Sequence, residues 1–360
     1  MGRKTGGTWA AALLAIAGVG CAGSEDPGLG VGAVKTHTPA ATFAPLVSLH
    51  PRERLLPLAA AAFLARSSLR WHDGDCGDAT VAGRSATPTR PRLEQSRLGG
   101  GGAYRHSAGR LPGCRPTRRY ASDEYTRPYD PSRTNGLQMD EGFYLDLADG
   151  AREGAPAIAR PDGRRLVRAP AYVERDVRRR GEYTMVRLTY WMLFGMERRP
   201  GPAAVAATSH EGDWRWVRIL LRTREGAGEY VPVGVRYGVR STYLPWRAVR
   251  RATDAGPRST HPAIFVARGG HDLFPRPGRY TRKIAIGERE LDLRQDALAC
   301  PRCTAWPTWR NLLDARRQPW HGYGGAWGET LGARTTPAGL GPGPWGDYTK
   351  DQLLPPGDTG

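Results

Sequence analysis

Alternating apolar and polar side chains characterise the chain after residue 120. Runs rich in β-branched and aromatic residues favour strands, and a period of two marks a strand with one solvated face. Such runs predict strands over residues 183–194, 214–221, 231–237, 263–267 and 282–286. After residue 120, helix is expected only over residues 245–252 and 308–316. Strands separated by loops rich in glycine and proline predict an all-β fold, a β-sandwich with few short helices.

The stretch before this pattern lacks sustained hydrophobic periodicity. Residues 83–119 are rich in arginine, proline, glycine, serine and threonine. Such a segment cannot bury enough apolar surface to offset the entropy lost on ordering. The exception is residues 55–71, where leucine and phenylalanine predict a short helix. We therefore expect a disordered N-terminal tether over residues 22–118 and one β-sandwich domain over residues 119–355.

A short apolar run over residues 9–20 follows two basic residues and precedes Cys21. It is typical of a signal peptide, because a membrane-spanning helix needs about 20 apolar residues. Cys21 at the cleavage point resembles a bacterial lipobox, although Gly18 stands where a leucine is usual. We expect residues 1–21 to be a lipoprotein-type signal peptide and Cys21 to carry a lipid that anchors the protein to a membrane of the cell envelope. Simple secretion and a chance apolar start are the alternatives.

The basic charge of the chain comes almost entirely from arginine. There are 53 basic and 35 acidic residues, a formal net charge of +18, and only four of the basic residues are lysine. Arginine in this excess is typical of a GC-rich genome. The arginines are scattered, with a dense run at residues 178–180, and no basic amphipathic helix or interleaved aromatic pattern accompanies them. Nucleic acid is therefore not an expected partner, and most of the arginines are interpreted as solvated surface, with an anionic polymer or lipid as the alternative ligand.

The four cysteines that remain after Cys21 are Cys76, Cys114, Cys300 and Cys303. An even number in an exported protein predicts two disulfides, for which three connectivities are possible. Cys300 and Cys303 have the CxxC spacing of redox motifs and of half a zinc site. No second CxxC completes a zinc site and no βαβ context supports a redox role, so structural disulfides are expected.

Two polar clusters lie at strand ends, at residues 209–214 and 269–272. Imidazole and carboxylate groups beside glycine at such positions can form loop-built metal sites. The candidate metal ligands are His210, Asp213, His271 and Asp272. Nitrogen and carboxylate ligands suit zinc or manganese, whereas carboxylates with carbonyl oxygens suit calcium. The candidate ligand-binding residues are Glu211, Trp214 and Arg215, with Glu211 also a possible general base.

The structural alternative is that these groups make loop hydrogen bonds and core contacts. No HExxH metalloprotease motif is present, because Trp214 occupies the second histidine position, and no GxSxG nucleophile motif occurs. The eleven tryptophans of the chain could line a surface for carbohydrate or lipid headgroups. Sandwich cores use tryptophan as well, and a core role is the favoured interpretation.

Several short motifs in order resemble the vacuolar protein sorting-associated protein 62 family, which has bacterial members. The motifs are Thr189-Tyr190-Trp191, His210-Glu211-Gly212-Asp213-Trp214, His261-Pro262, Gly270-His271 and the glycine-rich residues 320–328 and 341–344. Arg215 stands where the family usually has glutamate, and Asp272 where it has alanine. A guanidinium at position 215 would repel a cation. The His-x-x-Asp-Trp core is also distantly similar to the necrosis-inducing toxin family, whose sandwich binds a divalent cation beside a lipid-headgroup surface.

Three functions are compatible with the sequence. The first is a non-enzymatic, lipid-anchored envelope protein whose β-sandwich binds a lipid headgroup or a glycan. The second is a hydrolase that depends on a divalent cation, calcium or zinc, held by His210, Asp213 and His271. The third is a toxin-like module that binds membranes.

Overall fold

The computed structural model describes residues 38–72, 78–82, 142–147, 154, 157–159, 165–201, 203, 209–224, 228–238, 242–252, 259–286, 289–298, 303–318, 320–321 and 327–328. All of them belong to one of the two units into which the chain divides, residues 31–360. Strands account for 55% of the described residues, so the predicted all-β fold is confirmed. The two α-helices among the described residues are short, α1 (Pro39–Thr42) and α2 (Ala60–Ala65). No helix in the described ranges is long and apolar enough to cross a membrane.

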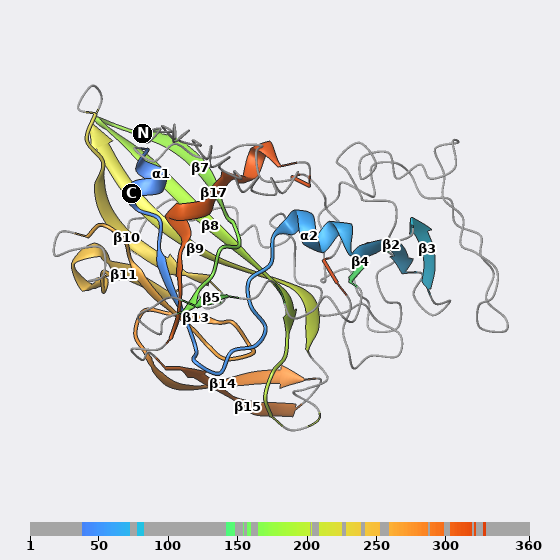
Figure 1. The fold of residues 1–360 in the computed structure, drawn as a ribbon. Helices are drawn as coiled ribbons and strands as arrows, with labels where there is room; N and C mark the ends of the chain where they lie inside the picture. Colours follow the sequence, from blue (N-terminus) through green and yellow to red (C-terminus); the bar gives the residue numbers. More distant parts are fainter. Residues whose placement is uncertain are drawn as a thin grey trace, which may run out of the picture. The chain divides into compact units, whose positions relative to one another are not determined.

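The first of two six-stranded sheets has the order β11-β10-β9-β8-β7-β17 (Figure 1). Its strands are β7 (Ala171–Arg180), β8 (Tyr183–Glu197), β9 (His210–Arg224), β10 (Val231–Tyr237), β11 (Thr242–Pro245) and β17 (Leu312–Asp314). Neighbouring strands are antiparallel except β17, which pairs in parallel with β7. The predicted strands over residues 183–194, 214–221 and 231–237 lie within β8, β9 and β10.

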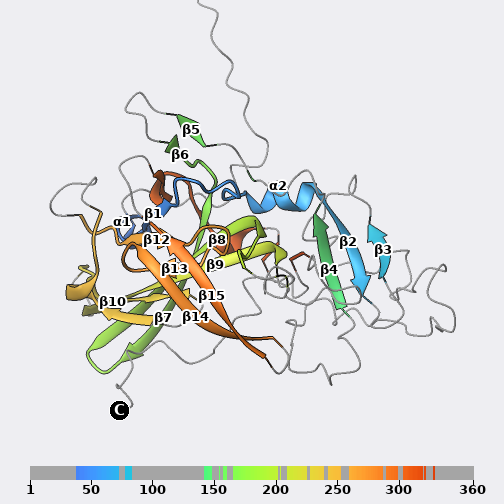
Figure 2. The same cartoon turned by 90° about the horizontal axis from the view of Figure 1, so that it is seen from below.

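The second six-stranded sheet has the order β13-β12-β1-β16-β6-β5. Its strands are β1 (Leu46–Leu49), β5 (Ile158–Ala159), β6 (Arg165–Leu166), β12 (Ala263–Val266), β13 (Leu273–Phe274) and β16 (Thr304–Pro307). The sheet is mixed, because β1 runs parallel to β12 but antiparallel to β16. Two smaller sheets complete the fold, the hairpin of β14 (Gly278–Ile286) and β15 (Arg289–Ala297), and the sheet of β2 (Ser67–His72), β3 (Asp78–Ala82) and β4 (Gly142–Leu147), which lies beside α2 (Figure 2).

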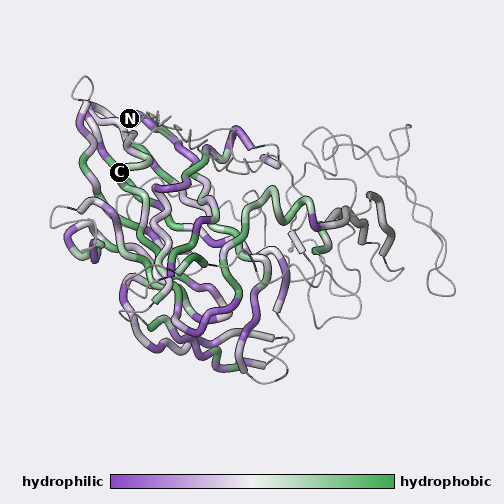
Figure 3. Tube along the Cα trace, viewed as in Figure 1, coloured by the Kyte–Doolittle hydropathy of each residue, from purple (hydrophilic) through white to green (hydrophobic). Residues whose placement is uncertain are grey.

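The main hydrophobic core joins the two large sheets. Leu188 and Ile219 of the first sheet belong to the same buried cluster as Val47, Val266 and Trp306 of the second. Apolar residues follow the strands that form this core (Figure 3). Burial of this apolar surface is the main force that holds the sheets together, and the predicted sandwich is the result.

A second core lies on the other face of the first sheet and is rich in aromatic rings. Tyr172 and Trp320 meet edge to face with their ring centroids 5.0 Å apart, and Trp214 and Trp327 do so at 5.1 Å. Phe63 of α2 packs against Trp327 at 5.4 Å. The tryptophans of this cluster are buried, so they serve as core, which is the favoured interpretation of the sequence.

The predicted tether over residues 22–118 is wrong for residues 38–72. Val47 and Leu49 of β1 are fully buried, and β1 lies in the interior of the second sheet. The strand has four residues and its partners, β12 and β16, lie more than 200 positions away, so no local periodicity marks it. The predicted helix over residues 55–71 is reduced to α2, because β2 begins at Ser67. Residues 78–82 form β3, so the tether prediction is wrong there too. The rest of the predicted tether, residues 22–37, 73–77 and 83–118, lies outside the described residues.

Two other predictions change with the structure. The helix expected over residues 308–316 is wrong at Leu312–Asp314, which form β17, and short 3-10 turns flank that strand. The helix expected over residues 245–252 is a 3-10 turn at Trp246–Ala248.

Cys303 is buried with its Sγ atom 3.6 Å from the Leu298 carbonyl oxygen. Cys21, Cys76, Cys114 and Cys300 lie outside the described residues, so lipidation and the disulfides stay predictions.

Candidate functional site

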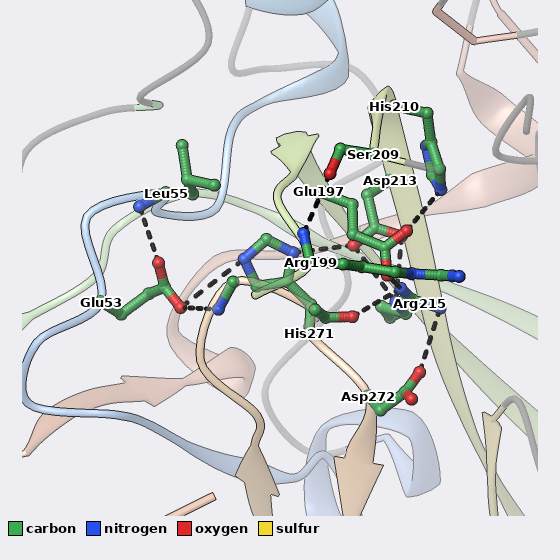
Figure 4. A network of polar contacts seen from close by, with 12 residues as sticks. Glu53, Leu55, Glu197, Arg199, Ser209, His210, Asp213, Arg215, His271 and Asp272 are labelled. Atoms are coloured by element: carbon green, nitrogen blue, oxygen red, sulfur yellow. Dashed lines mark hydrogen bonds and ion pairs between the residues drawn. The ribbon is translucent and has the colours of Figure 1, made fainter. Parts of the chain in front are cut away.

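Three segments bring the predicted polar residues together at one end of the β8–β9 hairpin. Glu197 ends β8 and pairs with His210, the first residue of β9, and Asp213 pairs with Phe194. The loop between β12 and β13 carries His271 to the same place, where its Nδ1 lies 2.7 Å from Asp213 Oδ2. The structure therefore brings together the two histidine-bearing segments that the sequence singled out (Figure 4).

Arg215 occupies the centre of this cluster. Its Nη2 donates to Glu197 Oε1 at 2.8 Å and to the Gly270 carbonyl oxygen at 2.6 Å. Its Nε lies 3.0 Å from Asp213 Oδ1, and its Nη1 lies 3.4 Å from Asp272 Oδ1. One guanidinium thus contacts three carboxylates and a carbonyl oxygen, in the manner expected of a bound cation. Burial alone would lower the pKa of Arg215, but the carboxylates raise it above its ordinary value.

His271 is held in place from several sides. Its ring stacks on Phe194 with centroids 3.9 Å apart, and its Nε2 lies 3.8 Å from Glu53 Oε2. Glu53 Oε2 also accepts a 2.6 Å hydrogen bond from the Gly269 backbone N–H. His271 has a φ of +49° and is fully buried. A positive φ in a non-glycine residue is strained, and the contacts to Asp213 and Glu53 hold it.

The imidazole of His210 faces an acceptor at each of its nitrogens. Nε2 lies 2.8 Å from Glu197 Oε2, and Nδ1 lies 2.8 Å from the Glu211 carbonyl oxygen. The carbonyl oxygen cannot donate, and Glu197 cannot donate when it is ionised, so the imidazolium form, which carries a proton on each ring nitrogen, fits both contacts. Burial would lower the pKa of His210, but Glu197 outweighs burial and raises it. Burial would likewise raise the pKa of Glu197, yet Arg215 and His210 hold it well below its usual range.

A buried group in this cluster could hold a metal ion. One ligand atom each from Glu197, His210 and Asp213 lie within 4.8 Å of one another. Two of these residues were predicted as metal ligands from the sequence, and Glu197 was not. His271 and Asp272, the other two predicted ligands, are bonded to Asp213 and to the Gln295 side chain respectively.

Two of the predicted ligand-binding residues point away from the cluster. Gly212 has a φ of +61°, and the side chains of Glu211 and Asp213 on either side of it go to opposite faces of β9. In a regular strand, residues two apart would share a face. Glu211 Oε2 accepts a 2.9 Å hydrogen bond from the Leu147 N–H of β4, and Trp214 packs in the aromatic core. Glu211 therefore supports β4, and a general-base role for it in this cluster is wrong.

Sequence reasoning missed Glu53 and Glu197. Glu53 lies in the segment that was expected to be a tether, and Glu197 follows the last apolar residue of a strand whose predicted end was residue 194. Glu197 could have been found because it pairs with His210 across the β8–β9 hairpin. Finding it in this way requires knowledge of the register in which β8 and β9 pair.

Comparison of the chain with models of protein families, with curated proteins and with solved structures finds no match. The resemblance to the vacuolar protein sorting-associated protein 62 family stays a prediction that depends on the motifs quoted above. The function must therefore be argued from the geometry.

Proposed function

We propose that this protein is an exported, non-enzymatic binding protein of the cell envelope, anchored by a lipid on Cys21, with the β-sandwich as its binding module. The short apolar run before Cys21 supports export and anchoring. The observation that carries the proposal is the burial of the polar cluster around Arg215. Because its side chains are withdrawn from solvent, the cluster favours a structural role in a binding protein over catalysis.

Every side chain that forms the cluster is withdrawn from solvent. The exposed fraction of the side chain is 8% for His210 and Asp272, 7% for Arg215 and lower for Glu197 and Asp213. A general acid or base has to reach the proton that it transfers, within hydrogen-bond distance or through one water. Side chains enclosed in this way are closed to a substrate in solution, although His271 Nε2 and Asp272 Oδ1 have no hydrogen-bond partner among the described residues.

The cluster has a clear structural role. It ties the end of β8 and the start of β9 in the first sheet to the loop between β12 and β13 in the second. Buried polar networks of this kind stabilise one arrangement when each member is satisfied, because an unpaired buried charge is costly. We infer that Arg215, Glu197 and Asp213 fix the junction between the two sheets of the binding module.

The alternative function is that of a hydrolase dependent on a divalent metal ion held by Glu197, His210 and Asp213. An imidazole nitrogen with carboxylate oxygens favours zinc over calcium, which prefers oxygen ligands throughout. Two features oppose it. Arg215 already contacts both carboxylates, and the raised pKa of His210 favours the imidazolium form, from which a metal would have to displace a proton.

Zinc analysis of the purified full-length protein separates the two functions. A hydrolase of this kind carries stoichiometric zinc and loses it in His210→Gln, while the control His261→Gln keeps it. His261 suits the comparison because its ring is bonded to the Ala44 carbonyl oxygen and stacked on Trp309, away from the cluster. The binding-protein proposal expects no stoichiometric zinc in any of the three proteins, and zinc that disappears only in His210→Gln would refute it.

Cell fractionation tests export and anchoring. The full chain is expected in the membrane fraction of a bacterial host, and Cys21→Ser in the soluble exported fraction, because the acyl chain supplies the attachment. The neighbouring change Ser24→Ala is the control and should fractionate like the wild type. Identical fractionation of the wild type and Cys21→Ser would contradict the lipid anchor.

A further inference from the structure

A buried space lined by polar atoms lies beside Gly270, in the loop between β12 and β13. Gly270 is buried, and a Cβ added to it would lie 3.7 Å from Gln295 Nε2 and 3.8 Å from Glu197 Oε1. Apart from its neighbours in the chain, no other atom of the described residues comes within 4 Å of that position. The glycine therefore leaves room at the edge of the polar cluster, and a donor and an acceptor face this room.

The side chains around this space come from several elements and are buried. Arg215 of β9 contacts Glu197 Oε1 and the Gly270 carbonyl oxygen through Nη2, and its Nη1 lies 3.4 Å from Asp272 Oδ1 (Figure 4). Gln295 of β15 is 6% exposed and donates through Nε2 to Asp272 Oδ2. The space thus lies where the β8–β9 hairpin, the β12–β13 loop and the β14–β15 hairpin meet.

These groups keep hydrogen-bonding capacity that their neighbours do not use. Asp272 Oδ1 is buried and has no hydrogen-bond partner among the described residues, because its 3.4 Å contact with Arg215 is an ion pair only. The Gln295 amide nitrogen carries two hydrogens, of which Asp272 Oδ2 accepts one. Buried polar atoms are almost always bonded, and an ordered internal water is the usual partner where the protein supplies none.

The charges around the space decide what kind of ligand fits it. The carboxylates of Glu197 and Asp272 repel an anion, and the guanidinium of Arg215, which contacts both, repels a cation. The ligand must also accept a hydrogen bond from Gln295 and donate one to Asp272. A water molecule meets these conditions, because it is small and neutral and can both donate and accept.

We propose that one ordered water molecule occupies the space beside Gly270. It accepts a hydrogen bond from Gln295 Nε2 and donates one to Asp272 Oδ1, with its second hydrogen toward Glu197 Oε1. The water then extends the junction between the two large sheets to the β14–β15 hairpin, and Gln295 is the residue that positions it. This inference rests on the structural role that the proposed function gives to the polar cluster.

Gly270→Ala tests the site, because the added methyl group fits the space and takes the place of the water. The φ of Gly270 lies outside the left-handed region, so alanine is not strained there. Gly278→Ala is the matched control, since its φ is also unrestricted and its Cβ would make only ordinary contacts, 3.5 Å or longer, with the Tyr280 ring.

High-resolution crystal structures of the full chain give the direct result. The wild type and Gly278→Ala should show a water within hydrogen-bond distance of Gln295 Nε2 and Asp272 Oδ1, and Gly270→Ala should lack it. The melting temperature of Gly270→Ala should lie about 2–4 °C below that of Gly278→Ala, because the bonds made through the water are lost. The wild-type structure decides the question even if Gly270→Ala fails to fold.

Three results would overturn the proposal. They are a wild-type structure with no water at this position, a Gly270→Ala variant that melts at the same temperature as Gly278→Ala, and anomalous scattering from zinc in the space. The first two leave zinc analysis and cell fractionation untouched, so failure of the water site is distinguishable from failure of the proposed function. Only the zinc signal would contradict both.

Discussion

Replacement of Arg215 by methionine removes the charge at the centre of the cluster and leaves a shorter, unbranched apolar side chain. The change leaves the carboxylates of Glu197, Asp213 and Asp272 buried, and the Gly270 carbonyl oxygen loses its 2.6 Å donor. Breaking a buried ion pair by removing one partner costs about 3–5 kcal/mol. Each carboxylate keeps another donor, so we expect the lower end of this range, about 3 kcal/mol.

Urea unfolding followed by tryptophan fluorescence measures this loss, and thermal unfolding should show a melting temperature lowered by about 6–12 °C. The control is Arg224→Met, which removes the same charge from an exposed position and should change the free energy of unfolding by no more than about 0.5 kcal/mol. Adding Glu197→Gln to Arg215→Met should recover part of the loss, because the uncompensated charge disappears. A cost below about 1 kcal/mol for Arg215→Met would refute the structural role of the cluster.

Three further predictions concern the folded state. The folded pKa of His210 is raised above 6.5, so its ion pair stabilises fully below pH 6.5 and the stabilisation is lost as pH rises through the folded pKa. The free energy of unfolding of the wild type should therefore fall as pH rises above 6.5, and His210→Gln should flatten that fall. Gly212→Ala should destabilise the protein by at least about 2 kcal/mol more than Gly181→Ala in thermal unfolding. The angle φ is near +60° at both positions, but only at Gly212 would a Cβ meet a backbone oxygen. Equal destabilisation by the two changes would count against the close packing of β9 at Gly212. Tyr172→Phe should cost about 1 kcal/mol and speed hydrogen exchange at the Ala60 N–H, to which the Tyr172 hydroxyl is bonded at 2.8 Å, and unchanged exchange would show that the bond does not protect α2.

The sequence predicted the strands that are long enough to show a clear periodicity of apolar residues. β8 and β9 have 15 residues each and β10 alternates along its full length, so their periodicity predicts them. The strand β1 has four residues, and both of its partners, β12 and β16, lie more than 200 positions away in the chain. Such strands owe their conformation to tertiary contacts, which local sequence does not encode.

The candidate site was partly predictable for a related reason. Polar residues beside glycines at strand ends identified His210, Asp213 and His271, which the structure brings together. The central position of Arg215 depends on contacts with β8 and with the β12–β13 loop, and no local pattern specifies these. The orientation of Glu211 depends on the left-handed φ of Gly212, which reverses the alternation that the sequence implies.

The protonation state of His210 tests most directly the claim that the cluster is a self-neutralised junction between the sheets. Nitrogen-15 NMR of the imidazole ring at pH 6.5, in the full-length protein with and without one equivalent of zinc, reports both ring nitrogens. We predict that both carry protons and that zinc leaves their chemical shifts unchanged, with His210→Gln assigning the signals. A ring with one unprotonated nitrogen whose signal moves on addition of zinc would contradict the claim and favour the metal-dependent hydrolase.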